Sequence, residues 1–353
     1  MRIPVLSHSS IFAALGAAVL FGVSTPLAKV LLHDLSPVLL AGLLYLGSGV
    51  GLGVVRIARD RGWRPPGIAR IEWLWLLLAI AFGGILGPLA MMLGLAHTSA
   101  ATASLLLNLE SVLTALLAWV VFRENVDRRI VIGMLMIVSG AVLLTLPGAT
   151  QAAHLGWGAL LIAGACLCWA LDNNLTRKVS ASDAVFIAGL KGLVAGVVNI
   201  AIAVFMGTRW PAPQFVGMAM VVGLLGYGVS LVLFVLALRG LGSARTGAYF
   251  STAPFIGAAI GIFALGDPAS WAFWLAAVVM GAGVWLHLTE RHEHLHTHEP
   301  ITHTHRHLHD AHHQHVHDFD WNGREPHTHE HTHAPLTHSH PHYPDIHHQH
   351  RHS

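Results

Sequence analysis

Residues 130–148 read IVIGMLMIVSGAVLLTLPG, and this run contains no charged side chain. Its length is close to the ~20 apolar residues that an α-helix needs to cross the ~30 Å hydrocarbon core of a bilayer. Runs of this kind follow one another along the chain with only short breaks. We therefore predict an all-α integral membrane protein with ten transmembrane helices, at residues 11–32, 37–58, 72–95, 101–121, 130–148, 156–176, 184–206, 215–238, 246–264 and 270–288.

The composition is typical of a membrane protein. Hydrophobic residues make up 54% of the chain and charged residues 11%, at a mean hydropathy of +0.59, whereas soluble domains carry roughly 25% charged residues. The first apolar run continues without a cleavage signal, so we expect a retained helix and not a removed signal peptide. No phosphate-binding glycine loop, nucleophile motif or catalytic metal signature occurs in a soluble segment. We predict that the protein is not an enzyme, and its net charge of +2 gives no indication of a nucleic-acid partner.

Basic residues indicate the orientation in the membrane. Five arginines lie at or between the inner ends of the second and third predicted spans: Arg56, Arg59, Arg61, Arg64 and Arg70. Positively charged loops stay in the cytoplasm, so this loop fixes all the others by alternation. We predict a multi-pass protein of the cell inner (plasma) membrane, with the N-terminus and the C-terminus both cytoplasmic.

The chain contains an internal repeat. Residues 95–124 match residues 238–267 at a constant offset of 143, and a second register sets Phe21-Gly22-Val23-Ser24 against Trp169-Ala170-Leu171-Asp172. Because five is an odd number of crossings, a duplicated five-helix unit must insert upside down relative to its partner. We therefore predict two inverted five-helix repeats, residues 1–148 and 149–289, followed by a tail at residues 290–353.

Several short segments resemble a known family. Residues 237–249 read ALRGLGSARTGAY, and the other similar positions are Pro254, Phe122-Arg123-Glu124, Gly133 and Gly140. In these segments the chain is similar to the EamA family of the drug/metabolite transporter (DMT) superfamily, and the resemblance covers residues 11–288. It implies ten helices, no nucleotide-binding machinery, and secondary transport of small solutes, usually export driven by an ion gradient. It also implies a solute cavity lined by spans one, three, four, six, eight and nine.

Glu110 lies near the middle of the fourth predicted span, beside Asn108. An ionised side chain at that depth is costly, so it is a functional candidate by default. A carboxyl group there could bind a cation or carry a proton. The alternative is a protonated glutamic acid that forms a hydrogen bond between helices.

Polar residues also interrupt spans six and seven. Asp172, Asn173 and Asn174 follow one another in span six, and Lys191 lies in the antiparallel span seven. Asp172 and Lys191 could form a structural ion pair or take part in solute binding. The three consecutive polar side chains favour a cavity lining or a gate. If the charges of Asp172 and Lys191 cancel, Glu110 would favour a cation or a proton over an anion.

From His292 onward histidine dominates and no apolar period survives. Such a segment buries too little apolar surface to fold alone, so we predict a disordered, histidine-rich cytoplasmic tail. The tail is itself repeated, because residues 296–317 and 331–352 lie 35 positions apart and share nine histidines.

Histidine side chains at His-x-His spacing on a flexible chain can close on one transition-metal ion. We predict that the tail binds Ni²⁺, Co²⁺ or Zn²⁺, although no cofactor is required. The alternative is a pH-responsive polymer that gains positive charge in acid and binds anionic lipids. The candidate metal ligands are His296, His298, His303, His305, His307, His312, His313, His315, His317, His331, His333, His338, His340, His342, His347, His348, His350 and His352.

Three functions remain open from the sequence. In the first, the protein is a secondary exporter that exchanges divalent transition-metal ions for protons. In the second, it exports a metabolite or drug, and the tail only senses or buffers metal. In the third, it is a membrane-tethered metal store. The expected partners are a small solute or metal-ion substrate and the lipid bilayer, and a homodimer is one alternative for its assembly.

Overall fold

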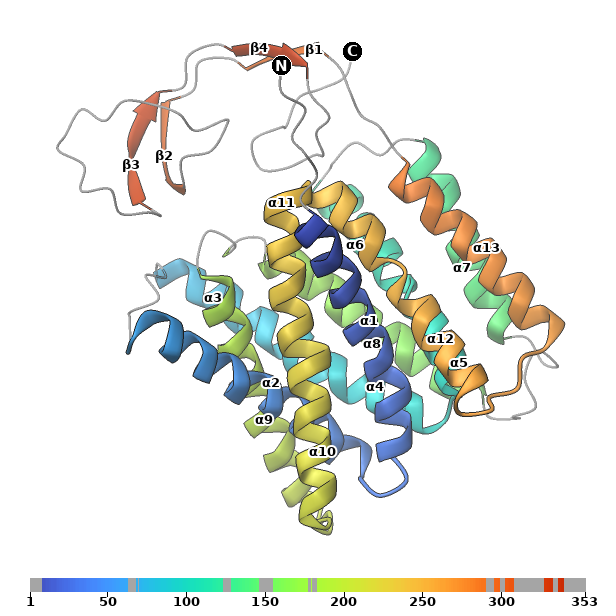
Figure 1. Cartoon of the computed structure of the whole chain (residues 1–353). Coiled ribbons are helices and arrows are strands. Elements are labelled where there is room, and N and C mark those ends of the chain that lie inside the picture. Colours follow the sequence, from blue (N-terminus) through green and yellow to red (C-terminus); the bar gives the residue numbers. More distant parts are fainter. Residues whose placement is uncertain are drawn as a thin grey trace.

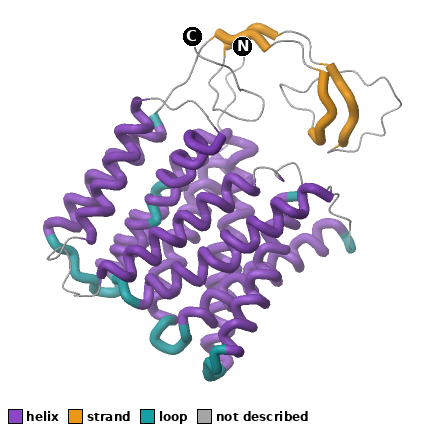
Figure 2. The backbone as a smooth tube through the Cα atoms, turned by 180° about the vertical axis from the view of Figure 1, so that it is seen from behind, coloured by secondary structure: helices purple, strands orange, loops and turns teal. Residues whose placement is uncertain are grey.

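The computed structural model describes residues 8–62, 68, 70–122, 128–145, 155–176, 179, 183–289, 295–298, 302–307, 327–332 and 336–339. Its membrane part is a bundle of helices, and the described pieces of the tail lie beside it as short strands (Figures 1 and 2). The helical elements are α1 (His8–Leu31), α2 (Pro37–Asp60), α3 (Arg70–Ala79), η1 (Ile80–Leu86), α4 (Gly87–Ala96), α5 (Ala100–Leu106), α6 (Leu109–Phe122), α7 (Arg128–Thr145), α8 (Leu155–Thr176), α9 (Ala184–Phe205), α10 (Pro213–Gly223), η3 (Leu224–Val229), α11 (Ser230–Phe250), α12 (Ala253–Phe263) and α13 (Trp271–Leu288).

Nine segments of the described chain are long and apolar enough to cross a membrane, and α12 is a shorter apolar helix. The eighth candidate span ends at Ala237, one residue from its predicted end, although helical hydrogen bonding continues through residues 239–245 as part of α11. The helix is interrupted later, at Ser251 and Thr252, just before Pro254. Proline has no N–H to donate to the preceding turn and disfavours helical geometry in the residue before it. The ninth span is therefore divided between the end of α11 and α12.

Span four has an interruption at the matching place. Leu107 and Asn108 separate α5 from α6, and the offset of 143 carries these residues to within one position of the break before α12. Two π-helical segments also match, because η1 and η3 lie 143 to 144 positions apart. None of these irregularities was predicted. Their repetition in both halves is independent structural support for the duplication.

The packing of the helices shows how the halves are related. In the first half, Gly83 in η1 lies so close to α8 that a side chain there would collide with the carboxylate of Asp172. In the second half, a Cβ at Gly226 in η3 would lie 2.5 Å from Cβ of Ser24 in α1. The offset of 143 carries Gly83 to Gly226, and the offset of 148 carries Ser24 to Asp172. One contact is therefore the copy of the other. The first helix of each half packs against the third span of the opposite half.

Helices α2 and α9 pack on one side of the bundle, where backbone touches backbone (Figure 1). A Cβ at Gly192 would lie 2.6 Å from the backbone nitrogen of Gly49. Helix α7 packs against α13 in the same way, through Gly133 and Gly283. Each of these pairs joins equivalent spans of the two halves and runs antiparallel, as expected for inverted repeats. The pseudo-two-fold axis passes between them.

The described parts of the tail are the strands β1 (Leu295–His298), β2 (Thr302–His307), β3 (His327–Thr332) and β4 (Leu336–Ser339). Strand β1 pairs with β4 and β2 pairs with β3, both antiparallel. No strands were predicted there. Isolated two-stranded ladders are marginally stable in water.

Candidate functional site

Asp172 in α8 forms an ion pair with Lys191 in α9. The Lys191 Nζ donates to both carboxylate oxygens at 2.6 Å, and the Thr176 Oγ1 donates to one of them at 2.8 Å. The side chain of Asp172 is buried, so the lysine and the hydroxyl together replace the water that a carboxylate needs. Asp172 and Lys191 thus form the expected pair, and a solute role for either residue stays a prediction.

The π-helical segment η1 supplies the next layer of the site. The carbonyl oxygen of Gly83 accepts one hydrogen bond from Tyr45 Oη at 3.0 Å and another from Trp169 Nε1 at 3.1 Å. A π-helical turn shifts the backbone hydrogen-bonding pattern, which leaves such a carbonyl available to side chains. Tyr45 and Trp169 were missed in the sequence analysis. The signal was present, because Trp169 occupies the repeat position of Phe21.

Glu110 at the start of α6 contacts α8 through an amide. The Asn173 Nδ2 donates to Glu110 Oε1 at 2.9 Å and lies 3.5 Å from Thr114 Oγ1. Asn173 and the neighbouring Ser111 are exposed although both lie within apolar spans. Polar side chains at such depth normally line protein contacts or a water-filled cavity, because lipid cannot satisfy them.

Asn108 and Asn174 do not join this pair. Each is buried and donates to a carbonyl of its own helical segment, Asn108 to Leu105 and Asn174 to Ala170, both at 2.9 Å. Glu110 therefore contacts Asn173 and not Asn108, its near neighbour in the sequence. Asn108 instead helps to shape the interruption between α5 and α6.

An aromatic cluster, formed by Phe21, Tyr45, Tyr227, Phe234 and Phe250, lies between α1, α2, η3 and α11. Ring centroids are 5.6 Å apart for Tyr45 and Tyr227, and 5.3 Å apart for Phe21 and Phe250. Tyr45 also donates to the carbonyl oxygen of Gly83, the residue packed against Asp172. It thus connects the ion pair of α8 and α9 to the aromatic cluster. Sequence reasoning missed this cluster because its members come from four separate segments.

The end of the bundle where α4, α5, α12 and α13 meet is called here the Asp267 end. Asp267 Oδ2 accepts a hydrogen bond from the backbone N–H of Ala101 at 2.8 Å, and Lys29 Nζ donates to the carbonyl oxygen of Leu95 at 2.8 Å. A carboxylate thus meets the N-terminal turn of α5 and an ammonium meets the C-terminal turn of α4, as the helix dipoles favour. A Cβ at Gly257 in α12 would lie 2.6 Å from Ser104 Oγ in α5. This end is tightly closed.

The opposite end, where α2 ends and α9 begins, is called here the Asp183 end. Its packing lacks the copy of one contact made at the Asp267 end. There α2 packs against α4, whereas the equivalent pair, α9 with the described N-terminal part of α11, does not pack closely.

The predicted metal ligands fall into two groups. Across the described side chains, no group of three or more His, Cys, Asp or Glu is arranged to hold a metal ion. In the tail, the β2–β3 register sets His303, His305 and His307 opposite His331, His329 and His327, and β1–β4 sets His296 opposite His338. His327 and His329 were omitted from the predicted ligands, although the His-x-His alternation continues through them. His298 lies opposite Leu336, and the remaining predicted ligands, His312, His313, His315, His317, His333, His340, His342, His347, His348, His350 and His352, lie outside the described residues.

Comparison with known proteins identifies the family. The sequence model of the EamA-like transporter family matches residues 8–146 and again residues 156–289. An uncharacterized transporter of Methanothermobacter thermautotrophicus is 30% identical over 285 residues, which cover 76% of this chain and 83% of that protein. The uncharacterized transporter YyaM of Bacillus subtilis is 23% identical, over 79% of this chain and 93% of its own length.

Two further likenesses bear on the fold and on one half of the chain. A crystal structure of another protein shares the fold, with a TM-score of 0.58 at 19% identity over 79% of this chain and 95% of that one. The probable 4-amino-4-deoxy-L-arabinose-phosphoundecaprenol flippase subunit ArnE of Pseudomonas aeruginosa is 37% identical over 110 residues, which cover 31% of this chain and 91% of that subunit. The two matched halves, the ten-span helical bundle and these relatives lead to one conclusion: the chain belongs to the EamA-like transporter family.

Proposed function

We propose that this protein is a proton-coupled exporter of small cationic organic solutes. The observation that carries the proposal is the contrast between the two acidic side chains of the site. Asp172 has a charged partner, Lys191, whereas Glu110 has a neutral one, Asn173. The first carboxylate is neutralised in place, and the second can exchange a proton for a cation.

The surroundings of Glu110 favour an organic cation over a transition-metal ion. Asn173 offers Glu110 an amide, and it also lies beside the hydroxyl of Thr114. Helix α8, which carries Asn173, reaches the aromatic cluster because Trp169 and Tyr45 donate to the same Gly83 carbonyl. Transition metals prefer imidazole and thiolate ligands, whereas aromatic faces attract organic ammonium groups. The geometry therefore favours the second function raised by the sequence, export of a metabolite or drug, over export of metal ions.

The groove at the Asp183 end supports a direction of access. The arginines Arg56, Arg59 and Arg61 lie at this end, and the positive-inside rule assigns it to the cytoplasm of the inner (plasma) membrane. A solute would reach Glu110 from the cytoplasm and displace its proton. Closure of the Asp183 end and opening of the Asp267 end would then release the solute outside, where a proton returns.

For the tail we propose binding of Ni²⁺, Co²⁺ or Zn²⁺ that senses or buffers the metal. The register of β2 and β3 supports this, because it sets three histidines of one strand opposite three of the other. Directly opposite residues have Cβ atoms about 5 Å apart, close enough for two imidazoles to share one ion. Such binding would order a segment that otherwise has little stability of its own.

The test is uptake into inverted membrane vesicles under an imposed pH gradient. The substrates are tetraphenylphosphonium, Ni²⁺, Co²⁺ and Zn²⁺, and the proteins are the intact chain, Glu110→Gln and a chain that ends at Arg291. We expect gradient-driven uptake of the organic cation, its loss in Glu110→Gln, and full retention in the shortened chain. Asp34→Asn, which changes an exposed carboxylate in the loop after α1, is the matched control.

Two other results of this uptake experiment would support the other two functions raised by the sequence. Gradient-driven metal uptake that depends on both Glu110 and the tail would make the protein a metal exporter. No transport of any substrate, together with tail-dependent retention of metal in cells, would make it a membrane-tethered store.

A further inference from the structure

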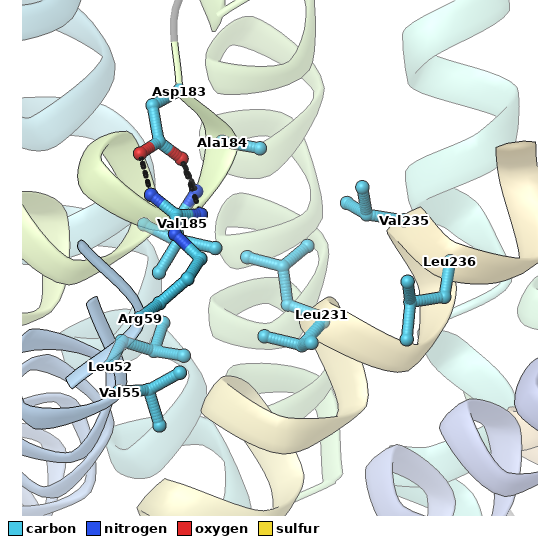
Figure 3. A pocket seen from close by; sticks show the side chains of 11 residues that line it. Leu52, Val55, Arg59, Asp183, Ala184, Val185, Leu231, Val235 and Leu236 are labelled. Carbon is cyan, nitrogen blue, oxygen red and sulfur yellow. Dashed lines mark hydrogen bonds and ion pairs between the residues drawn. The ribbon is translucent and has the colours of Figure 1, made fainter. Parts of the chain in front are cut away.

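A groove opens between α2, α9 and α11 at the Asp183 end (Figure 3). Its volume is about 200 Å³. Its walls are aliphatic apart from one polar pair: Leu52, Val55, Ala184, Val185, Ala188, Leu231, Val232, Val235 and Leu236 line it together with Arg59 and Asp183.

The groove exists because the pseudo-two-fold symmetry is broken at this end. At the Asp267 end α4 packs against α2, but its repeat copy α11 is not closely packed against α9 within the described chain. Side chains on both walls consequently stay accessible, with Val55 47% and Leu236 48% exposed. Such aliphatic surface on a membrane-spanning bundle faces the acyl chains of the surrounding leaflet.

One end of the groove carries a fixed pair of opposite charges. Asp183 caps α9 by accepting a hydrogen bond from the N–H of Val185 at 3.0 Å, and it accepts another from Arg56 Nε at 3.3 Å. Arg59 bridges Asp183 and Asp60, with 2.7 Å between its Nε and the Asp60 oxygen. The side chain of Arg59 is still 46% exposed. A ligand at this point would find a guanidinium and carboxylates side by side.

We propose that the groove holds an acyl chain of a phosphatidylethanolamine molecule from the leaflet at the Asp183 end, with the headgroup at Arg59 and Asp183. The apolar walls suit the chain, and the charged pair suits the two charges of the headgroup. Arg59 can donate to the phosphate, because guanidinium groups bind phosphate oxygens well. The carboxylate of Asp183 can accept from the ammonium. A charged pair of this kind favours a zwitterionic headgroup over an anionic one.

The proposal concerns a lipid site and does not depend on which solute is transported. A chain in the groove would also keep α9 and the N-terminal part of α11 from packing closely. The lipid would have to leave before α11 could close on α9.

The test uses the full chain reconstituted in nanodiscs that contain a phosphatidylethanolamine with a photoreactive diazirine in its acyl chain. Labelled peptides are identified by mass spectrometry. We expect label on residues 183–190 and 231–236, reduced at least fivefold by Ala188→Trp, which fills the groove from α9. Leu236→Trp, which fills it from α11, should act in the same way if Ala188→Trp fails to fold. Val197→Trp, on an exposed part of the same helix α9, should leave the labelling unchanged.

A second arm tests the headgroup with diazirine probes of phosphatidylethanolamine, phosphatidylcholine and phosphatidylglycerol. We expect phosphatidylethanolamine to label best and Arg59→Gln to remove the preference. Labelling spread evenly over the exposed helices, or unchanged in both tryptophan variants, would overturn the site. A preference for phosphatidylglycerol would overturn the headgroup assignment, and displacement of the probe by tetraphenylphosphonium would show that the groove holds transported solute instead of lipid.

Discussion

The two ends of the bundle are built from repeated sequence, yet they pack differently. At the Asp267 end α5 lies against α12, and a lysine and an aspartate bind the helix ends beside residues 97–99. At the Asp183 end α9 and the described N-terminal part of α11 are not closely packed, and a groove opens between α2, α9 and α11. We expect such a difference if two groups of helices tilt about the α2–α9 contact.

This comparison suggests how alternating access works in this chain. If the halves are equivalent, a tilt that breaks the closing contacts at the Asp267 end should form the equivalent contacts at the Asp183 end. Substitutions that remove contacts found at one end only should then change which end is open. Substitutions at the axis should destabilise both the inward-open and the outward-open state.

The largest effect is expected at the axis itself. Gly192→Val places a branched side chain where a Cβ would lie 2.6 Å from the backbone nitrogen of Gly49. Helices α2 and α9 would have to separate, so we expect no monodisperse protein on size-exclusion chromatography. Gly164→Val in α8 is the control, because a Cβ at Gly164 meets nothing within 4 Å. Similar yields for the two variants would show that the α2–α9 contact is not the pivot.

The next effect is expected from Asp267, which holds the closed end. Asp267→Ala removes a hydrogen bond to a charged acceptor, which is worth roughly 1.5–3 kcal/mol. The ratio of the open to the closed form should therefore rise by about tenfold or more. The readout is labelling of Ser104→Cys by an impermeant maleimide from the outer side, in a chain in which Cys166 and Cys168 are alanine. Ser104 is buried against α12, so its labelling reports opening. Asp34→Ala should label like the parent, and equal labelling in Asp267→Ala would remove Asp267 from the closing contacts.

The sequence predicted the large features and missed the local ones. Apolar runs, arginine positions and the offset of 143 led to a ten-span bundle with two halves, because each depends only on composition and spacing. The π-helical segments and the divided fourth and ninth spans were missed, since no local pattern marks a shifted hydrogen bond. Only the Pro254 break had a local cause.

The candidate site shows the same limit. Glu110, Asp172, Asn173 and Lys191 stood out because charged and strongly polar side chains are rare in apolar spans, and the structure places all four in α6, α8 and α9. Their pairing was not predictable in full, because Asn108 and Asn173 are equally polar and only the helix rotation decides which one faces Glu110. The groove between α2, α9 and α11 could not be predicted either, because aliphatic residues line it as they line every helix contact here.

A smaller effect is expected from Lys29, which acts on the same closed end through a helix dipole. Its Nζ binds the last carbonyls of α4, an interaction typically worth about 0.3–1 kcal/mol. Lys29→Met should therefore raise the labelling of Ser104→Cys only about two- to fivefold. Lys29→Arg keeps the charge and should restore the parent level, and an increase as large with arginine as with methionine would mean that packing and not charge is responsible.

The smallest effect is expected at the Asp183 end, where the ion pair is partly exposed. Burial opposes the ionisation of Asp183, but the hydrogen bonds and charge of Arg59 outweigh it and hold the pKa of the carboxyl below its ordinary value. The stabilisation is therefore complete above the unfolded pKa of about 3.9 and is lost as the pH falls through the lower folded pKa. Since partly exposed pairs contribute at most about 1 kcal/mol, Asp183→Asn should lower Tm slightly at pH 7, and the difference from the parent should shrink below about pH 4. Asparagine still caps a helix, so the comparison isolates the charge. A Tm difference that stays constant from pH 7 to pH 3.5 would show that Asp183 acts through its cap and packing, and that the charged pair does not stabilise the open end.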